Sequence, residues 1–371
     1  MKMCFGNSLG FKFANNLTAN EIFGYCYGGF LLEVAEDIAD AAEIGEITAD
    51  GKISYNGEEI RLERLLGIYE NKLESVYRCN KENPKTEMLT FSYTAENRVS
   101  PAVKTAKPKV LIPVFPGTNC EYDSAKAMRD AGAEPEIFVI NNRSAENVAK
   151  SVEEFANSLK TAQMVFIPGG FSGGDEPDGS GKFITAFFRN AAVKEQVTDL
   201  LDNRDGLMCG ICNGFQALIK LGLVPYGKII DTDENCPTLT YNTIARHQSK
   251  IVRTRIASNK SPWLADTEVG DIYSVPISHG EGRFIASDEL ILRLAENGQI
   301  ATQYVDEKGE ATSDIHFNPN GSYYAIEGIT SPDGRVFGKM GHSERYAADL
   351  YKNVPGNYDI KMFRSAVKYF K

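Results

Sequence analysis

Short, nearly continuous apolar runs alternate with amphipathic segments from about residue 110 onward. The runs that predict strands are "VLIPVF" (110–115), "EIFVI" (136–140), "MVFIPGG" (164–170) and "GLMCGI" (206–211). Helical spacing near 123–131 and 145–159 separates the first three runs. Apolar strands that alternate with helices are typical of a parallel sheet covered on both faces. Such a sheet places its functional groups at the carboxyl ends of the strands.

Residues 1–78 show a different pattern. The segment "EIGEITADGKISYNGEEI" (43–60) predicts a hairpin that turns at Asp50-Gly51, and Asn56-Gly57 marks a second turn. Apolar residues then recur at helical spacing from Leu62 to Val76, so one stripe of this helix is expected to be buried. These features predict a small α+β segment over 1–78. Residues 79–107 are polar and weakly periodic, which predicts a linker crossing a surface before a larger α/β domain at 108–371.

Composition and charge narrow the class of protein. The 371 residues are 42% hydrophobic and carry a formal net charge of −10, which argues against nucleic acid or an anionic membrane as the main partner. No apolar run reaches the roughly 18 residues of a membrane span, and the first residues lack the apolar core of a signal peptide. The seven cysteines are scattered rather than dense, as expected for free thiols in a cytoplasmic protein.

The segment "GICNG" (210–214) lies where the fourth apolar run ends and a helical pattern begins. Glycines stand two positions before and after Cys212, and small neighbours permit a sharp turn that projects the central side chain above the sheet. A helix amino terminus favours the thiolate and so lowers the pKa of a thiol placed there. Cys212 is therefore the predicted nucleophile, whereas Cys209, inside the apolar run, is predicted to pack in the core.

Other interpretations use the same two cysteines. Cys-x-x-Cys at a strand-to-helix turn is also a thiol redox motif, in which Cys209 would be the attacking sulfur. A structural zinc site would need a second ligand pair at short spacing, and neither the other cysteines nor the four histidines provide one, so no metal is expected. Inert packing of both sulfurs is the remaining alternative.

A cysteine nucleophile needs a base and a group that orients the base. His342 follows the apolar run "RVFGKM", and Glu344 stands two positions later. Side chains repeat every second residue in extended backbone, so the carboxylate can fix the imidazole tautomer. A solvated surface pair is the competing interpretation of this spacing. His279, between Ser and Gly in "SHGEGRF", is expected either in a polar pocket loop or as a satisfied structural histidine.

A glycine-rich loop, "PGGFSGGDEPDGSGKF" (168–183), follows the third apolar run. Its backbone N–H groups, together with the N–H of Asn213, are candidates to stabilise an oxyanion. A phosphate-binding P-loop is excluded, because Glu176 stands where that motif has its first glycine and Phe183 replaces the magnesium-binding hydroxyl. A plain strand-to-helix connection is the alternative.

Six segments together resemble the glutaminase domain of phosphoribosylformylglycinamidine synthase, a class I glutamine amidotransferase. They are, in order, "FPGTNCEYDSA", "IPGGFSGGD", "CGICNGFQALIKLGLVP", "SHGEGRF", "FNPNGS" and "GKMGHSER". The resemblance spans about 108–371 and implies a flavodoxin-like three-layer sandwich with a mostly parallel central sheet. Residues 1–107 more weakly resemble the end of the preceding synthetase half and its linker, through "GYCYGGFLLEV" and "LERLLGIYENKLESVY".

The resemblance also implies a reaction and roles for residues. Cys212 would attack the side-chain amide of glutamine, His342 would carry protons and Glu344 would orient His342. The implied oxyanion site is Gly170, Phe171 and Asn213, and the implied substrate contacts are Gln216, Asn242 and His279. Ammonia would pass to a partner synthetase that uses ATP and magnesium to convert formylglycinamide ribonucleotide to the amidine. No cofactor site is expected in this chain, which looks like a carboxyl-terminal piece of a longer enzyme or a gene fragment.

One departure from the family pattern concerns the histidine. Many members have proline on both sides of it, whereas this chain has Gly341 and Ser343, so the strand end is expected to be less rigid. Two other functions stay open on the sequence alone. The chain could be another cysteine hydrolase on the same fold, or a non-catalytic docking module that keeps the turn without its chemistry.

Overall fold

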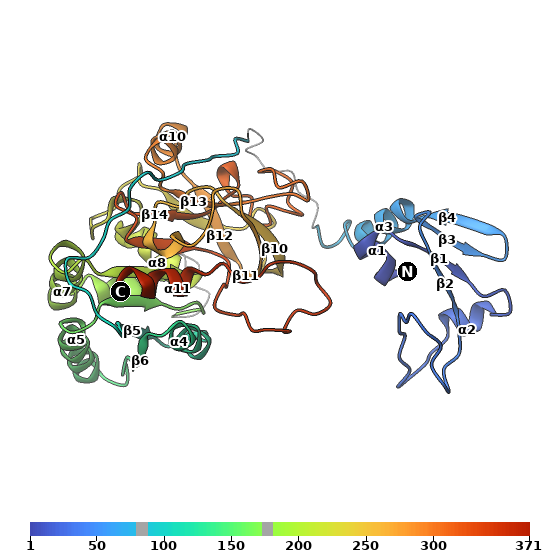
Figure 1. Ribbon diagram of the computed structural model, residues 1–371, viewed down its shortest axis with the longest axis horizontal. Helices are drawn as coiled ribbons and strands as arrows, with labels where there is room; N and C mark the ends of the chain where they lie inside the picture. The colour runs from blue at the N-terminus through green and yellow to red at the C-terminus, as the bar shows by residue number, and fades with distance from the viewer. Residues whose placement is uncertain (79–87, 173–180) are drawn as a thin grey trace. The chain divides into compact units, whose positions relative to one another are not determined.

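The computed structural model describes residues 1–78, 88–172 and 181–371. The described residues form two compact units, with 1–78 in the first and all later ones in the second (Figure 1). The predicted linker and the glycine-rich loop fall partly outside the described residues, at 79–87 and 173–180. None of the described helices is long and apolar enough to span a membrane.

The first unit is a four-stranded sheet with three short helices. Its elements are α1 (Lys2–Asn7), β1 (Gly10–Phe13), α2 (Ala19–Phe23), β2 (Gly45–Thr48), β3 (Lys52–Tyr55), β4 (Glu58–Arg61) and α3 (Leu62–Asn71). The strand order is β2-β1-β3-β4. The second predicted turn, at Asn56-Gly57, joins the antiparallel strands β3 and β4.

The hairpin predicted at Asp50-Gly51 is wrong, because β1 lies between β2 and β3. Strand β1 is antiparallel to β2 and parallel to β3. A Cβ atom on Gly10 would lie 2.3 Å from Thr48 Oγ1 and 2.6 Å from the Lys52 carbonyl oxygen, so the strand can enter there because Gly10 has no side chain. The predicted apolar stripe is also buried only in part: within the first unit Leu62 is buried, whereas Leu73 is 59% exposed.

The second unit is built on a nine-stranded sheet in the order β11-β10-β13-β14-β15-β8-β7-β5-β6. Its strands are β5 (Lys109–Val114), β6 (Glu134–Val139), β7 (Met164–Ile167), β8 (Leu207–Ile211), β10 (Gln248–Ile256), β11 (Ile272–His279), β13 (Ile300–Tyr304), β14 (Ile326–Thr330) and β15 (Val336–Lys339). The five strands from β15 to β6 are parallel. Beyond β15, β13 and β11 keep the same direction, whereas β14 and β10 run opposite. A two-stranded sheet of β9 (Thr238–Tyr241) and β12 (Glu281–Ile285) lies outside this order.

Helices cover both faces of the parallel strands and give the predicted three-layer α/β architecture (Figure 1). Helix α4 (Glu121–Asp130) packs with α11 (Met362–Tyr369). A second group contains α5 (Ala145–Leu159), α6 (Lys182–Phe188), α7 (Ala191–Asp202) and α8 (Asn213–Leu221), in which α5 contacts α7 and α6 contacts α8. The remaining helical elements are α9 (Leu223–Tyr226), α10 (Asp288–Glu296), η1 (Pro262–Leu264) and η2 (Tyr323–Ala325). The strands predicted from the four apolar runs are confirmed as β5, β6, β7 and β8.

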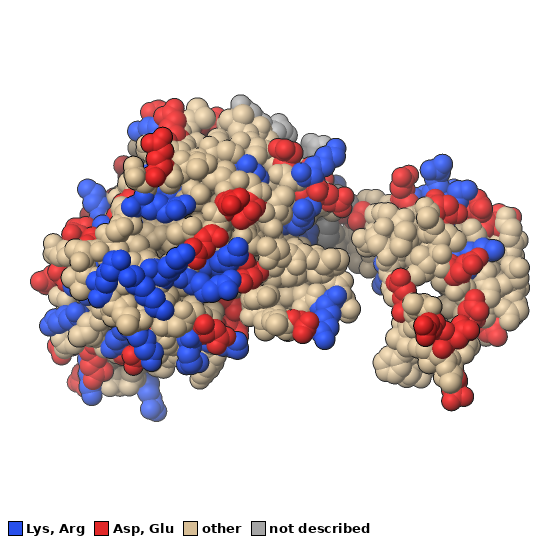
Figure 2. Space-filling view, in the orientation of Figure 1, with Lys and Arg blue, Asp and Glu red and all other residues tan. Residues whose placement is uncertain are grey.

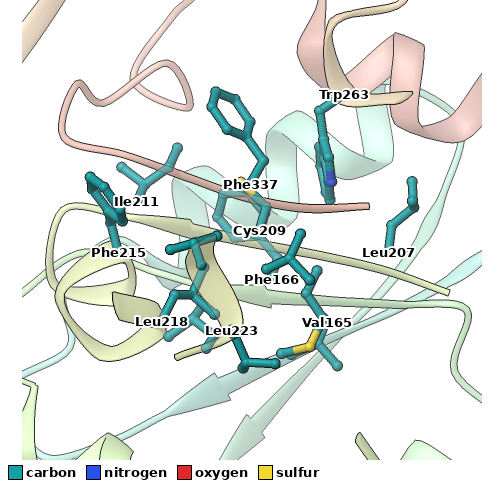
Figure 3. Close-up of a cluster of buried hydrophobic side chains, with 14 of the residues drawn as sticks. Val165, Phe166, Leu207, Cys209, Ile211, Phe215, Leu218, Leu223, Trp263 and Phe337 are labelled. Atoms are coloured by element: carbon teal, nitrogen blue, oxygen red, sulfur yellow. The ribbon is translucent and has the colours of Figure 1, made fainter. Parts of the chain in front are cut away.

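The core of the second unit lies against the central strands. Strands β7 and β8 are buried along their whole length, because each has strands beside it and helices above and below. Figure 3 shows Cys209 within this apolar cluster, with Phe166 and Phe337 from the neighbouring strands. Burying a large apolar side chain stabilises a fold by about 1.5–3 kcal/mol. The central strands therefore form a rigid base for whatever stands at their carboxyl ends.

The described part of the predicted linker, residues 88–107, runs along the outside of the second unit (Figure 1). Its backbone is fastened at several places. The N–H of Tyr93 donates to the Ala257 carbonyl at 2.8 Å, and the N–H of Thr105 donates to the Phe370 carbonyl at 2.8 Å. The proposed division into 1–78, 79–107 and 108–371 stays a prediction, but the structure shows that this segment packs on the larger unit.

The net negative charge does not make the visible surface uniformly acidic. Figure 2 shows lysine and arginine side chains beside aspartate and glutamate across the visible face of the second unit. Several are paired, for example Lys368 with Asp266 at 2.7 Å. Exposed pairs of this kind contribute about 0–1 kcal/mol each, so they say little about stability or partners.

Candidate active site

Cys212 occupies a strained turn between β8 and α8. Its backbone has φ 53° and ψ −106°, a conformation that is rare for a residue with a side chain. The flanking glycines are needed for close packing: a Cβ atom on Gly210 would lie 2.5 Å from the Gly214 carbonyl carbon, and one on Gly214 would lie 2.1 Å from the Ile167 oxygen. The predicted G-x-nucleophile-x-G turn is therefore present. It places Cys212 at the amino terminus of α8, where only 4% of the cysteine is exposed to solvent.

Strand pairing explains how His342, far along the chain, comes close to Cys212. Strands β8 and β15 are parallel neighbours with Ile211 opposite Lys339, so the segments that follow the two strands leave the sheet at the same edge. The Cys212 N–H donates to the Lys339 carbonyl at 2.9 Å. A Cβ atom on Gly169, after β7, would lie 2.6 Å from His342 Cε1 and 3.4 Å from Cys212 Cβ, so both side chains border the same point. The structure thus brings the predicted nucleophile and base together.

His342 and Glu344 form a buried ion pair. His342 Nδ1 lies 2.6 Å from Glu344 Oε1, with side chains 1% and 0% exposed, so the competing interpretation as a solvated surface pair is wrong. Burial is the largest single influence and disfavours the imidazolium, but Glu344, Cys120 and Cys212 together outweigh it, so the pKa of His342 lies well above its usual value. Burial is also the largest single influence on Glu344 and raises its pKa, but His342, a backbone hydrogen bond and Arg345 together lower it more, so the net shift is downward.

The free nitrogen of His342 is available to the nucleophile. Its Nε2 atom is buried and makes no hydrogen bond with any described residue. Cys212 Sγ instead lies 3.6 Å from the Ser278 carbonyl oxygen. Catalytic hydrogen bonds are often long in a free enzyme and tighten only when substrate binds. Both side chains border the same point, and His342 Nε2 is an acceptor for the Cys212 proton that no described residue occupies.

A small pocket opens beside Cys212. The residues that line it are Gly170, Phe171, Cys212, Gln216, His279, Gly280 and Glu281. The amide, imidazole and carboxylate groups that border it can form hydrogen bonds with a small polar molecule.

His279 lines this pocket as a neutral imidazole. Asn242 holds it: Asn242 Nδ2 donates to the His279 carbonyl at 2.8 Å, and Asn242 Oδ1 lies 3.1 Å from His279 Nδ1. Burial, with a smaller contribution from His342, lowers the pKa of His279 to about 3. Since Asn242 presents its oxygen, the proton belongs on Nδ1 and Nε2 is an acceptor, which finds no partner among the described residues. Asn242 itself is not among the residues that line the pocket, so it positions His279 from behind.

Gln216 is less available for substrate than the resemblance implies. Its Nε2 donates to the Glu281 carbonyl at 2.6 Å, and its Oε1 accepts from Asn213 Nδ2 at 2.9 Å. Asn213 Oδ1 in turn accepts from the Ser172 N–H at 3.2 Å. Gln216 therefore borders the pocket but first serves to tie α8 to β12.

The predicted oxyanion groups are only partly free. The Phe171 N–H donates to the Gly117 carbonyl at 2.8 Å, so in this arrangement it is not available to an oxyanion. Gly170 has φ 136° and lines the pocket. The Asn213 N–H belongs to the first turn of α8, where backbone donors have no intrahelical partner. A contribution from Phe171 would require its peptide to turn away from Gly117.

Sequence reasoning missed Cys120 and Arg345 as members of this site. Cys120 follows β5, and its Sγ lies 3.8 Å from His342 Nδ1 and accepts from Arg345 Nη2 at 2.9 Å. The available signal was position, because Cys120 comes shortly after a strand whose carboxyl end lies at the same edge as that of β8. Glu281 of "SHGEGRF" was also missed, because only His279, two positions before it, was predicted to line a pocket.

Cys120, His342 and Glu344 are also the described residues that could together hold a metal ion, with ligand atoms within 4.8 Å of one another. The arrangement does not favour a resident cation. The nitrogen and carboxylate oxygen are already joined by a 2.6 Å hydrogen bond, and a guanidinium group points at the sulfur.

The redox interpretation of the cysteine pair receives no support from the geometry. Cys209 and Cys212 are both free thiols. Cys209 is 0% exposed inside β8, and burial raises its pKa well above the usual value. A buried, protonated thiol is a poor nucleophile.

Residues 107–370 match the CobB/CobQ-like glutamine amidotransferase domain. The chain belongs to this amidotransferase family. It is 37% identical over 257 residues to phosphoribosylformylglycinamidine synthase subunit PurQ of Methanococcus maripaludis, which covers 68% of this chain and 87% of the relative. PurQ of Aquifex aeolicus is 33% identical over 250 residues, covering 67% and 95% of the two chains. Among solved structures, PurLQS from Thermotoga maritima matches with a TM-score of 0.52 and 26% identity, covering 71% of this amidotransferase and all of that chain.

Proposed function

We propose that this amidotransferase is the glutaminase part of a phosphoribosylformylglycinamidine synthase and that Cys212, His342 and Glu344 carry its chemistry. The observation that supports these roles is the parallel pairing of β8 and β15, because of which the turn carrying Cys212 lies beside a buried imidazole–carboxylate pair at the edge of a polar pocket. The family match supports the activity, and the PurQ relatives support the pathway, de novo purine synthesis.

In the proposed reaction, Cys212 Sγ attacks the side-chain carbonyl carbon of glutamine after giving its proton to His342 Nε2. The N–H groups of Asn213 and Gly170 stabilise the negative charge on the carbonyl oxygen. His342 then donates the proton to the leaving nitrogen, and ammonia departs while a γ-glutamyl thioester forms. His342 next removes a proton from water, which attacks the thioester, so that glutamate leaves and the Cys212 thiol is restored.

Binding of the substrate follows from the lining of the pocket. We assign His279 Nε2 as an acceptor for an N–H of glutamine, because it is a buried acceptor without a partner among the described residues. Gln216 and the Glu281 side chain would hold the amino-acid end, with Asn242 supporting His279 from behind. Phe171 would join the oxyanion site only once its peptide has turned.

The ammonia produced would pass to synthetase domains, fused or associated, that bind ATP and magnesium and convert formylglycinamide ribonucleotide to the amidine. Residues 1–78 would belong to the synthetase side, with 79–107 as the connection, since the family match begins at residue 107. The same proposal places the reaction in the cytoplasm.

Replacement of Cys212 by alanine tests the proposal in the enzyme reconstituted with its synthetase. Glutamine-dependent amidine synthesis should be lost, whereas synthesis driven by added ammonia should survive. Loss of both would show that Cys212 is structural. Labelling of wild-type Cys212 by a γ-glutamyl chloromethyl ketone separates a glutaminase from another cysteine hydrolase, and a docking module would show neither labelling nor turnover.

A further inference from the structure

A fully buried ion pair contacts the segment that carries His342. Lys339 Nζ lies 3.3 Å from Glu327 Oε1, and both side chains are 0% exposed. Burying two charges is costly, and replacing such a pair by apolar residues is often neutral or stabilising. Stability alone is therefore a weak reason for a lysine at the end of a central strand.

Three of the other side-chain hydrogen bonds of this pair go to the two residues that flank His342. Glu327 Oε1 accepts from the Gly341 N–H at 2.6 Å. Lys339 Nζ donates to the Gly341 carbonyl and to Ser343 Oγ, each at 2.9 Å. With Glu327 as its third partner, the ammonium uses all three of its donors. The other carboxylate oxygen of Glu327 accepts from Thr302 Oγ1, so the network extends to β13.

The segment after β15 has only two backbone N–H groups, those of Met340 and His342, that donate to carbonyls of neighbouring strands among the described residues. Residues 340–344 are not part of a helix or strand. Gly341 restricts its backbone least of all residue types. The Met340 and His342 N–H groups donate to the Glu327 and Pro276 carbonyls at 3.2 and 2.9 Å, whereas the Ser343 N–H donates at 3.1 Å to Gly341 within the segment itself. A shift of about 1 Å in a catalytic group can lower a rate by about 100-fold.

We propose that Lys339 and Glu327, acting through Gly341 and Ser343, are positioning residues that hold His342 between Cys212 and Glu344. The proposal rests on the proposed role of His342 as the proton carrier. The strand end is expected from the sequence to be less rigid, but a buried ammonium–carboxylate pair hydrogen-bonds to the Gly341 backbone before the imidazole and to the Ser343 hydroxyl after it.

The test uses the full chain reconstituted with its synthetase and the double variant Lys339→Met/Glu327→Gln, which removes both charges and keeps an acceptor for Gly341. The variant should retain the wild-type melting temperature, lower the kcat for glutamine hydrolysis by at least tenfold and leave KM within about twofold, because the pocket is untouched. The matched control is Lys109→Met/Glu136→Gln. This pair also joins two neighbouring strands, at 2.6 Å, but involves the first residue of β5, outside the site, and should keep the wild-type kcat.

A single variant, Ser343→Ala, keeps the charges paired and breaks one bond of the network. It should lower kcat severalfold, and adding it to Lys339→Met should cause no loss beyond that of Lys339→Met alone, because the bond to Ser343 is already absent there. A wild-type kcat in the folded double variant overturns the proposal, as does a wild-type kcat in Ser343→Ala if the double variant does not fold. Failure of the proposed function is distinguishable, because the wild-type chain itself would then resist the γ-glutamyl chloromethyl ketone.

Discussion

Replacement of Glu344 by glutamine tests the electrostatic core of the site. The carboxylate lies 2.6 Å from His342 Nδ1, and both groups are almost completely buried. A hydrogen bond to a charged group contributes about 1.5–3 kcal/mol, which corresponds to roughly a 10- to 150-fold change in rate. The glutamine amide can also favour the wrong imidazole tautomer, which in serine proteases raises the loss to about 10⁴-fold. We expect kcat to fall by about 10- to 10⁴-fold with little change in KM.

The assay is steady-state glutaminase activity of the reconstituted enzyme, with NMR titration of the His342 imidazole in the full chain. Glu344 is the largest of the contributions that oppose burial in the wild-type protein, so its removal should lower the pKa of His342. Asp314→Asn is the matched control, because Asp314 Oδ1 lies 2.7 Å from His316 Nδ1 but both side chains are about half exposed. The control should stay within twofold of wild type. A Glu344→Gln enzyme that keeps more than a tenth of the wild-type kcat would refute the reasoning.

Three further changes have defined outcomes. Cys209→Ala should leave glutaminase turnover within about threefold of wild type, since that sulfur lies in the core. Loss of turnover in a folded variant would support the redox interpretation that needs both cysteines. Gly169→Ala should lower kcat because its Cβ atom would lie 2.6 Å from His342 Cε1, and an unchanged kcat would show that the imidazole moves freely. The pKa of His279 is about 3 in the folded chain against about 6.5 unfolded, so the unfolded chain takes up the proton first as pH falls. Below pH 6.5 the free energy of unfolding in urea should therefore fall more steeply for the wild type than for His279→Gln, by about 1.4 kcal/mol per pH unit. The same dependence on pH in both proteins would contradict this.

The parallel half of the fold could be predicted because each central strand is an apolar run of its own. Local spacing also identified Cys212 and the His342–Glu344 pair as candidates, since a turn between glycines and a His-x-Glu spacing are visible in the letters. Their meeting could not be read from periodicity, because nothing in either segment specifies that β15 lies beside β8. The general rule that parallel strands gather their carboxyl ends at one edge supplied that step.

Features set by distant partners were missed. Strand β1, which begins at Gly10, lies between β2 and β3, although the sequence pattern predicts that these two strands pair directly. The pairing of the first sheet therefore depends on a residue far from the turn at Asp50-Gly51. Lys339 is of a residue type that is almost never fully buried unless paired, and only the contact with Glu327 on the neighbouring strand explains its place. The hydrogen bond that occupies the Phe171 N–H likewise depends on Gly117, after another strand.

The position of β15 has a consequence for biogenesis. It is the last strand of the large sheet to be synthesised, yet it pairs with β14 and β8 near the middle of the sheet. Until residues 336–339 emerge from the ribosome, the nascent chain carries two unsatisfied strand edges at what will become its centre. Exposed edges invite pairing with other molecules, and non-local closure is slow. Truncation before β15 should therefore yield an aggregating polypeptide that depends on chaperones, rather than an inactive but soluble one.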